Sequence, residues 1–477
     1  MTGTHHNTEM FDSTKTHPLG TTEQNWSLAV SRGTGTTVLV LQMAKSPSET
    51  PLLHEILIKL RKTHPLLRSK LHHNATTNEY TLLTSTTTTT PQVDIEFHDI
   101  PSTTRLLQSL SAKQGSNNLS SSHLILEHEL NINSWSDPNS FPPKDIDVIF
   151  ASVYALSDAK CAIVLRLHAS ICDRTTAVSL LMELMGLVVE AEGGGTQPGI
   201  KNDGEGKMGI ESMIPSGMAK KTFWAHGMDM LGYSVNSLRL TNLKFKNTKL
   251  PRSSEVVRLQ MNTHHTAGIL AGCKSRGIKL CGALAAAGLI AAHSTKPESD
   301  QLKKKYGVVT IIDCRPLLEP ALSSHHYGLY QSALLNTHTL KGTENLWDLA
   351  VRCYNDFARY KKCNKHFSDM TDINYLMRKA IENPSLTASS SLRTSLISVF
   401  EDPVIDNTNQ MQQGIGVEDY IGCASVHGVG PSIGIFDTIR DGELDCACVY
   451  PSPLHSREQM NAMVDHMKKI LIDGSSD

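Results

Sequence analysis

A histidine and an aspartate five residues apart are the residues of this chain best placed for proton chemistry. His168 follows the apolar run Ala162 to Leu165, which predicts that it stands at the end of a strand. Asp173 precedes the stretch Thr175 to Val189, whose apolar residues recur at helical spacing, so it stands where a helix N-cap belongs. A histidine held near a carboxylate can act as a general base. The structural alternative, a packed histidine beside a capping aspartate, is a common arrangement.

The stretch Arg166 to Arg174 resembles the active-site region of the CoA-dependent acyltransferase and condensation-domain superfamily. That family carries two adjacent histidines, three variable residues and then Asp-Gly. Other blocks of the chain resemble the family's blocks in the same order, so the resemblance extends over roughly residues 20 to 472. These blocks are Leu60 to Arg68, Ser275 to Ala292, Ile311 to Leu318 followed by Tyr327-Gly328, and Tyr450 to Met460.

The chain departs from the family pattern inside the motif. Alignment on Asp173 places His168 at the first histidine and Ala169 at the second, which is the usual base, and Arg174 replaces the glycine. The Asp-Phe-Gly-Trp-Gly block of plant acyltransferases is also missing, so the chain resembles the alcohol acetyltransferase-like branch. Either His168 has taken over as base, or acyl transfer is lost.

The resemblance implies an α+β fold with two pseudo-related halves, each with a mixed β-sheet and flanking helices. The halves would form a chloramphenicol-acetyltransferase-like V shape with a central tunnel. We expect a disordered N-terminus over residues 1–20, an N-terminal half over 21–190 and a C-terminal half over 223–477. Residues 191–222, rich in Gly, Ser, Pro and charge, are expected to be a linker or mobile loop.

The resemblance also implies roles for residues outside the motif. Asp173 is expected to be structural and to pair with Arg315 from the second half. In a strand Asp313 and Arg315 share a face, so Asp313 can compete for the same guanidinium. The residues expected to contact substrate or line the tunnel are Ala169, Tyr327, Gly328, Ser425 and Ser432, of which the two serines could stabilise an oxyanion.

Two functions are compatible with these residues. The first is an acyltransferase that moves an acyl group, such as acetyl, from a CoA thioester to an alcohol or amine of a small molecule, with His168 as general base. Acyl-CoA would be a co-substrate and no cofactor would be bound. The second is a degenerate acyltransferase scaffold that binds a small metabolite or catalyses a lyase or cyclisation step.

Composition disfavours several other classes of function. The formal net charge of the 477 residues is -2, which gives no electrostatic case for nucleic acid or an anionic membrane. The 22 histidines include adjacent pairs but no His-Glu-x-x-His spacing, so we expect no metal site. Ten cysteines without a Cys-x-x-Cys pair, and no apolar leader, predict a cytoplasmic protein. We expect a monomer, and we interpret Cys172 as a packed thiol.

Overall fold

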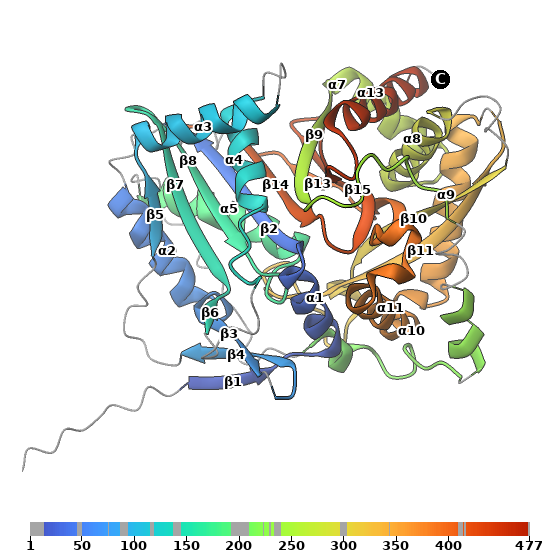
Figure 1. The fold of residues 1–477 in the computed structure, drawn as a ribbon, viewed down its shortest axis with the longest axis horizontal. Helices are drawn as coiled ribbons and strands as arrows, with labels where there is room; N and C mark the ends of the chain where they lie inside the picture. The colour runs from blue at the N-terminus through green and yellow to red at the C-terminus, as the bar shows by residue number, and fades with distance from the viewer. Residues whose placement is uncertain are drawn as a thin grey trace, which may run out of the picture.

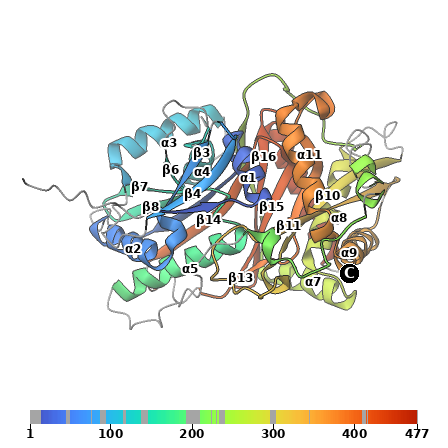
Figure 2. The same cartoon turned by 90° about the horizontal axis from the view of Figure 1, so that it is seen from below.

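The computed structural model describes residues 14–44, 50–74, 76–85, 94–114, 119–136, 145–191, 209–222, 224–228, 230–232, 240–295, 303–342, 344–408, 414 and 416–475. Figures 1 and 2 show two groups of strands and helices side by side, one formed mostly by the earlier part of the chain and the other by the later part. Both groups combine mixed sheets with helices, which confirms the predicted α+β class. A tunnel between the halves stays a prediction.

The first half holds the motif. Its strands are β1 (Thr14–Pro18), β2 (Thr34–Met43), β3 (Ser69–Asn74), β4 (Glu79–Ser85), β5 (Ile95–His98), β6 (Ile146–Asp147), β7 (Ile149–Ser157) and β8 (Lys160–Leu167). Its helices are α1 (Thr21–Ser31), α2 (Thr50–Thr63), α3 (Ile100–Gln114), α4 (Ser121–Leu130) and α5 (Arg174–Ala191), with a 3-10 turn η2 (Pro65–Arg68). A four-stranded sheet has the order β1-β4-β3-β6, and a five-stranded sheet has the order β14-β2-β8-β7-β5.

The second half contains the larger sheet, with the order β11-β10-β12-β15-β16-β9 and with β13 paired to β15. Its strands are β9 (Ser253–Met261), β10 (Lys304–Asp313), β11 (Gln331–Leu340), β12 (Arg393–Phe400), β13 (Val404–Asp406), β14 (Val417–Val426), β15 (Gly430–Arg440) and β16 (Glu443–Ser452). Its helices are α7 (Thr263–Ser275), α8 (Leu280–Ser294), α9 (Leu346–Lys362), α10 (Lys365–Ser368), α11 (Met370–Glu382) and α13 (Arg457–Gly474). Short 3-10 turns are η3 (Ile210–Met213), η5 (Arg315–Leu317), η6 (Pro384–Leu386) and η7 (Ala388–Ser390).

Strand β2 lies between β14 and β8 in the five-stranded sheet and is buried on both faces. Leu39 and Leu41 belong to the apolar cluster that includes α2 and α5, whereas Val38 and Val40 belong to the cluster that includes α4. Alternate side chains of a strand point to opposite faces, so a strand covered on both sides has a continuous apolar sequence. This burial holds β2 and its neighbour β8 rigidly against each other.

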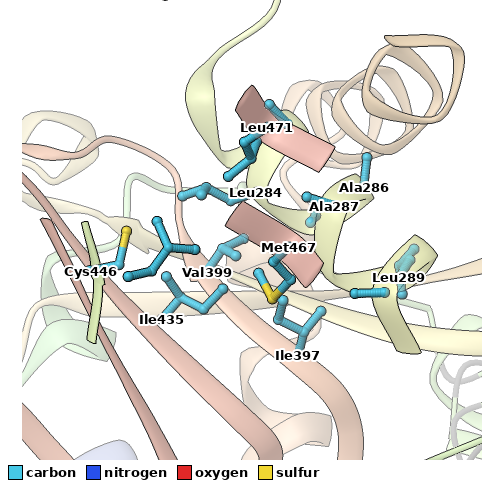
Figure 3. Close-up of a cluster of buried hydrophobic side chains, with 14 of the residues drawn as sticks. Leu284, Ala286, Ala287, Leu289, Ile397, Val399, Ile435, Cys446, Met467 and Leu471 are labelled. Atoms are coloured by element: carbon cyan, nitrogen blue, oxygen red, sulfur yellow. The ribbon is translucent and has the colours of Figure 1, made fainter. Parts of the chain in front are cut away.

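The core of the second half is built around α8. This helix is rich in alanine and buried along nearly its whole length, including Ala286, Ala287 and Leu289. Figure 3 shows its side chains meeting Ile397 of β12 and Met467 of α13. No single helix of the described ranges is long and apolar enough to span a membrane; α7 and α8 pass such a test together, but they are bent by 107°.

Strand β14 departs from the predicted division into halves. Its sequence lies within 223–477, yet it pairs antiparallel with β2 of the first half, from Val417 opposite Met43 to Val426 opposite Thr34. The chain then turns back into β15 of the large sheet. Because β2 otherwise offers an open edge, a strand from the second half satisfies its backbone hydrogen bonds. The second half is therefore not self-contained.

Parts of the predicted disordered N-terminus and of the predicted linker are ordered in the structure. Residues Thr14–Pro18 form β1, which pairs with β4, so only residues 1–13 of that prediction lie outside the described residues. Within the predicted linker, Ile210 and Met213 are buried in an apolar cluster of the second half. The high content of Gly, Ser and Pro in this segment does not reveal that it packs against the second half, because two buried apolar residues suffice for the contact.

Candidate active site

The motif forms a tight turn between strand β8 and helix α5. The Ile171 N–H donates to the His168 carbonyl at 3.1 Å, and the Cys172 N–H donates to the Ala169 carbonyl at 3.3 Å. The strand ends at Leu167 because the backbone turns here, and α5 starts at Arg174. The turn therefore places His168 and Asp173 at its two ends, as the sequence predicts.

His168 is fully buried, with 0% of its surface exposed. Its Nδ1 accepts the Ser170 backbone N–H at 3.1 Å and lies 2.8 Å from the Ser170 hydroxyl. The Trp135 ring contacts the imidazole edge-on, with the ring centroids 5.1 Å apart. Because Nδ1 accepts a backbone proton, the neutral ring carries its own proton on Nε2. This arrangement orients the ring, but it also occupies the basic nitrogen.

Ala169 is buried beside two features of the first half. A side chain on Gly35 would lie 3.0 Å from the Trp26 ring and 3.3 Å from the Ala169 methyl, so both groups flank the Gly35 backbone. Gly35 has φ +98, a conformation that glycine adopts freely. The position of the family's usual base is therefore filled by a methyl group within a packed apolar cluster.

Asp173 and Arg315 form a bidentate ion pair between the two halves. The guanidinium nitrogens Nη1 and Nη2 donate to the two Asp173 oxygens at 2.9 and 3.0 Å, and Asp313 also accepts from Nη1 at 3.0 Å. Arg315 is 1% exposed. Burial alone would lower its pKa, but Asp173 and Asp313 outweigh burial and raise the pKa of the guanidinium.

Asp173 also organises the backbone around it. Its carboxylate accepts the Thr176 N–H at 2.9 Å, which caps helix α5, and the Tyr330 N–H at 2.8 Å. The two carboxylate oxygens thus accept four hydrogen bonds, two from Arg315 and two from backbone amides. Asp173, Arg315 and their partners are called the interhalf clasp below.

Tyr327 and Gly328 lie next to the interhalf clasp. The Gly328 carbonyl accepts the Asp173 N–H at 3.2 Å and the Thr176 hydroxyl at 3.0 Å. The Tyr327 hydroxyl donates to Glu183 at 2.8 Å, and its ring stacks on His64 with centroids 4.0 Å apart. Both residues thus support the motif turn from the second half, and a contact with substrate stays a proposal.

Ser425 and Ser432 lie on the strands that join the halves. The Ser425 hydroxyl accepts the Thr36 N–H at 3.1 Å, one residue beyond Gly35 on β2. The Ser432 side chain is fully buried, and its hydroxyl has no hydrogen-bond partner among the described residues. Each hydroxyl keeps a proton that it can donate.

Arg174 makes contacts that the motif alone does not indicate. It forms an ion pair with Asp437 of β15 at 3.0 Å, donates to the Asp402 carbonyl at 3.1 Å and lies 4.1 Å from the centroid of the Phe400 ring. Burial raises the pKa of Asp437, although Arg174 partly offsets this effect. The replacement of the family's glycine by arginine was the available signal for this second link between the halves.

Cys172 lies within the turn as a buried thiol. Its sulfur contacts the Asp173 carbonyl at 3.4 Å, and burial raises the pKa of the thiol far above its ordinary range. A thiol that stays protonated is a poor nucleophile. No group of three metal-ligating side chains converges within the part of the chain that the structure describes.

Comparison with known proteins gives matches to solved structures alone, since no protein-family model and no curated protein matches the sequence. A trichothecene 15-O-acetyltransferase from Fusarium sporotrichioides has a TM-score of 0.69 at 10% identity, covering 97% of this chain and 95% of that chain. Polyketide synthase associated protein 5 from Mycobacterium tuberculosis has a TM-score of 0.62 at 14% identity, with coverages of 97% and 99%. The first condensation domain of the CDA synthetase has a TM-score of 0.61 at 11% identity, covering 97% of each chain.

These structures cover the whole molecule rather than one half, and they include acyltransferases and condensation domains. At such low identity the match establishes the fold alone. The chain has the chloramphenicol-acetyltransferase-like condensation fold of these structures over nearly its full length.

Proposed function

We propose that this protein transfers an acyl group from a CoA thioester to a hydroxyl or amine of a small molecule. The observation that carries the proposal is the interhalf clasp: Arg315 of the second half grips Asp173 at the motif turn, inside a complete acyltransferase fold. Holding donor and acceptor together at such a junction supplies much of the rate gain of a bimolecular transfer.

In this proposal His168 takes the acceptor's proton as the acceptor attacks the thioester carbonyl. Its basic nitrogen is Nδ1, so the Ser170 hydroxyl at 2.8 Å would have to turn away or relay the proton. The hydroxyls of Ser425 and Ser432 are candidates to stabilise the oxyanion, because each retains a proton to donate. Free CoA and an ester or amide would be the products.

A second candidate function follows from the burial of the motif. His168 has no exposed surface, its Nδ1 accepts a backbone proton, and Ala169 replaces the usual base. These observations favour a scaffold that retains the fold and binds a small molecule without transferring an acyl group. We propose this function as the alternative.

The test is release of free CoA from acetyl-CoA in the presence of mixed alcohols and amines, followed by mass spectrometry of the products. Acyl transfer predicts turnover by the wild type and a loss of about 100-fold or more in His168→Ala, in line with general-base catalysis. His264→Ala, at an exposed position on α7, is the matched control and should keep full activity. Full turnover in a folded His168→Ala variant would reject His168 as the base. No turnover by the wild type with any acceptor would favour the scaffold.

A further inference from the structure

Two arginines and a histidine gather where the β14–β15 hairpin meets the loop before β12. Arg252 precedes β9, Arg393 is the first residue of β12, and His427 lies in the hairpin turn. These three residues are called the basic cluster. Their positions are far apart in the sequence, so only the fold brings them together.

The two guanidiniums of the basic cluster share one acceptor. Arg252 Nη1 donates to the Ser391 carbonyl at 2.6 Å, and Arg393 Nε donates to the same oxygen at 3.2 Å. Like charges so close repel each other, and the repulsion is strong where water is excluded. An anion bound beside the two guanidiniums would offset this repulsion.

No carboxylate compensates these charges among the described residues. Arg393 is 3% exposed, and its other printed acceptors are carbonyls: those of Val426 at 2.9 Å, Pro431 at 2.5 Å and Gly428. Burial and the charge of Arg252 lower the pKa of Arg393 to about 9. An uncompensated buried charge is costly, which sets Arg393 apart from Arg315, whose partner is a carboxylate.

His427 adds a hydrogen-bond donor rather than a counter-ion. The Ser254 hydroxyl accepts the Val426 N–H at 2.9 Å, so its own proton points to His427 Nδ1 at 3.0 Å. The neutral ring then carries its proton on Nε2. Burial, Arg393 and Arg252 lower the pKa of His427 to about 4, which keeps the ring neutral at physiological pH.

The loop before β12 accepts hydrogen bonds from both arginines at the Ser391 carbonyl, and its backbone is strained. Ser389, Ser390 and Leu392 have φ values of 53, 51 and 57, in the left-handed region that favours glycine. Residues in this conformation are strained and are concentrated at functional sites. The strain presents the carbonyls of Ser390 and Ser391 to Arg252 and so fixes the cluster in place.

The basic cluster lies close to the motif. A side chain on Gly33 would overlap His427 Nε2, and Gly35 lies between Trp26 and Ala169. Gly33 and Gly35 are two residues apart, so His427 and Ala169 pack against neighbouring points of one short segment. The basic cluster and the motif turn are therefore neighbours in the fold.

We propose that the basic cluster binds the anionic group, a phosphate or a carboxylate, of the small molecule that occupies the candidate active site. Arg252 is half-buried and keeps unused donors, so it would contact the anion directly. This proposal rests on the proposed function in one respect, which is that the ligand binds next to the motif. A phosphate would come from CoA, and a carboxylate from the acceptor.

The test is titration calorimetry on the full chain with CoA, pantetheine, inorganic phosphate and succinate, each at up to roughly millimolar concentration. We expect at least one anionic probe to bind. If the cluster recognises phosphate, uncharged pantetheine should bind more weakly than CoA. Binding of succinate without phosphate would identify a carboxylate. Arg252→Gln should weaken the binding about tenfold or more, because a charge-assisted hydrogen bond contributes roughly 1.5–3 kcal/mol.

Matched variants keep this test independent of folding and of turnover. Arg359→Gln removes an exposed arginine that pairs with Asp356 on α9 and should bind like the wild type. Arg252→Lys should retain part of the affinity, because it keeps the charge. The proposal fails if none of the anionic probes binds the folded wild type, or if Arg252→Gln binds as tightly as the wild type. Binding without CoA release would support the basic cluster and count against acyl transfer.

Discussion

At the scale of single residues, the candidate site is dominated by groups whose hydrogen bonds are already used. Asp173 accepts two bonds from Arg315 and two from backbone amides, and His168 accepts one from the Ser170 amide. These bonds fix the turn rather than leave side chains free for substrate. Besides His168, whose Nδ1 would have to be released from the Ser170 hydroxyl, the groups that can still donate are the Ser425 and Ser432 hydroxyls and the arginines of the basic cluster.

Arg315→Met should destabilise the protein strongly. It leaves the Asp173 carboxylate buried without its cation, which costs about 3–5 kcal/mol for a buried pair. Chemical denaturation measures this loss, with the exposed Arg359→Met as the control. A loss below about 1 kcal/mol, the range of surface pairs, would show that the clasp contributes little to stability.

Ala169→His should overpack the turn and give no activity. Ala169 is 4% exposed, and a Cβ on Gly35 would meet both Trp26 and Ala169, so an imidazole would have to displace its neighbours at a cost of about 1–3 kcal/mol. A melting curve and the CoA-release assay are needed together, and Ala159→His in an exposed turn is the control. An unchanged melt with raised CoA release would instead identify a lapsed acyltransferase whose missing base has been restored.

At the scale of elements, β2 is the strand against which the rest of the site is built. It pairs with β8, which leads into the motif, and with β14, which leads to the basic cluster. Gly33 and Gly35 stand at its start, and both lie against groups that a side chain would displace. A change at this strand start should therefore affect the motif and the basic cluster together.

Gly35→Ala should destabilise the protein by more than the strain of its backbone conformation alone. Its φ of +98 disfavours any side chain by about 1–2 kcal/mol, and the new methyl would lie 3.0 Å from the Trp26 ring. Gly342→Ala is the matched control, because its φ is +63 and nothing lies within 4 Å of the added methyl. Equal destabilisation of the two variants in thermal melts would show that the packing around Trp26 and Ala169 is loose.

The elements differ in how well periodicity predicts them. Strand β8 and helix α5 are clear in the sequence, because their apolar residues follow the strand and helix patterns. Helix α4 does not stand out by periodicity, because its buried residues include Glu127 and Glu129. Their cationic partners, Arg457 and Arg166, come from other parts of the chain, and no local pattern reveals them.

At the scale of the whole molecule, the two halves are joined by buried polar contacts as well as by β14. Glu127 of α4 accepts two bonds from Arg457 of α13, both at 2.8 Å, and one from the Val256 N–H at 2.7 Å. The interhalf clasp and the Arg174–Asp437 pair connect the halves at two further points. We therefore expect the halves to unfold together in a single transition.

Glu127→Gln should alter the acid side of the stability profile. Burial alone would raise the pKa of Glu127, but His123 and Arg457 outweigh it and lower the pKa below the ordinary 4.5. A lowered carboxyl pKa gives stability that is fully present above pH 4.5 and is lost as the pH falls through the depressed value. Glu127→Gln should have a lower denaturation midpoint than the wild type at neutral pH. Its midpoint should then fall less steeply than that of the wild type as the pH is lowered.

Glu79→Gln, at an exposed position on β4, is the control for this experiment and should follow the wild-type profile. If Glu127→Gln and the wild type lost stability in parallel with falling pH, Glu127 would not be the titrating link between the halves. Separate transitions for the two halves would contradict the joint unfolding.

The sequence by itself determined the local frame of the candidate site. An apolar strand, a turn beginning at His168, a capping Asp173 and an amphipathic helix all follow from short-range periodicity and capping chemistry. The ordered motif blocks also predicted the fold class, and the partnership of Asp173 with Arg315 was expected from the family resemblance.

The tertiary structure alone decided which contacts these residues make and how deeply they are buried. The complete burial of His168, the ion pair of Arg174 with Asp437 and the pairing of β14 with β2 depend on contacts between segments far apart in the chain. The basic cluster likewise joins residues from three separate segments of the chain. Periodicity and capping report on neighbours along the chain, whereas burial and the sharing of charges depend on which segments pack together.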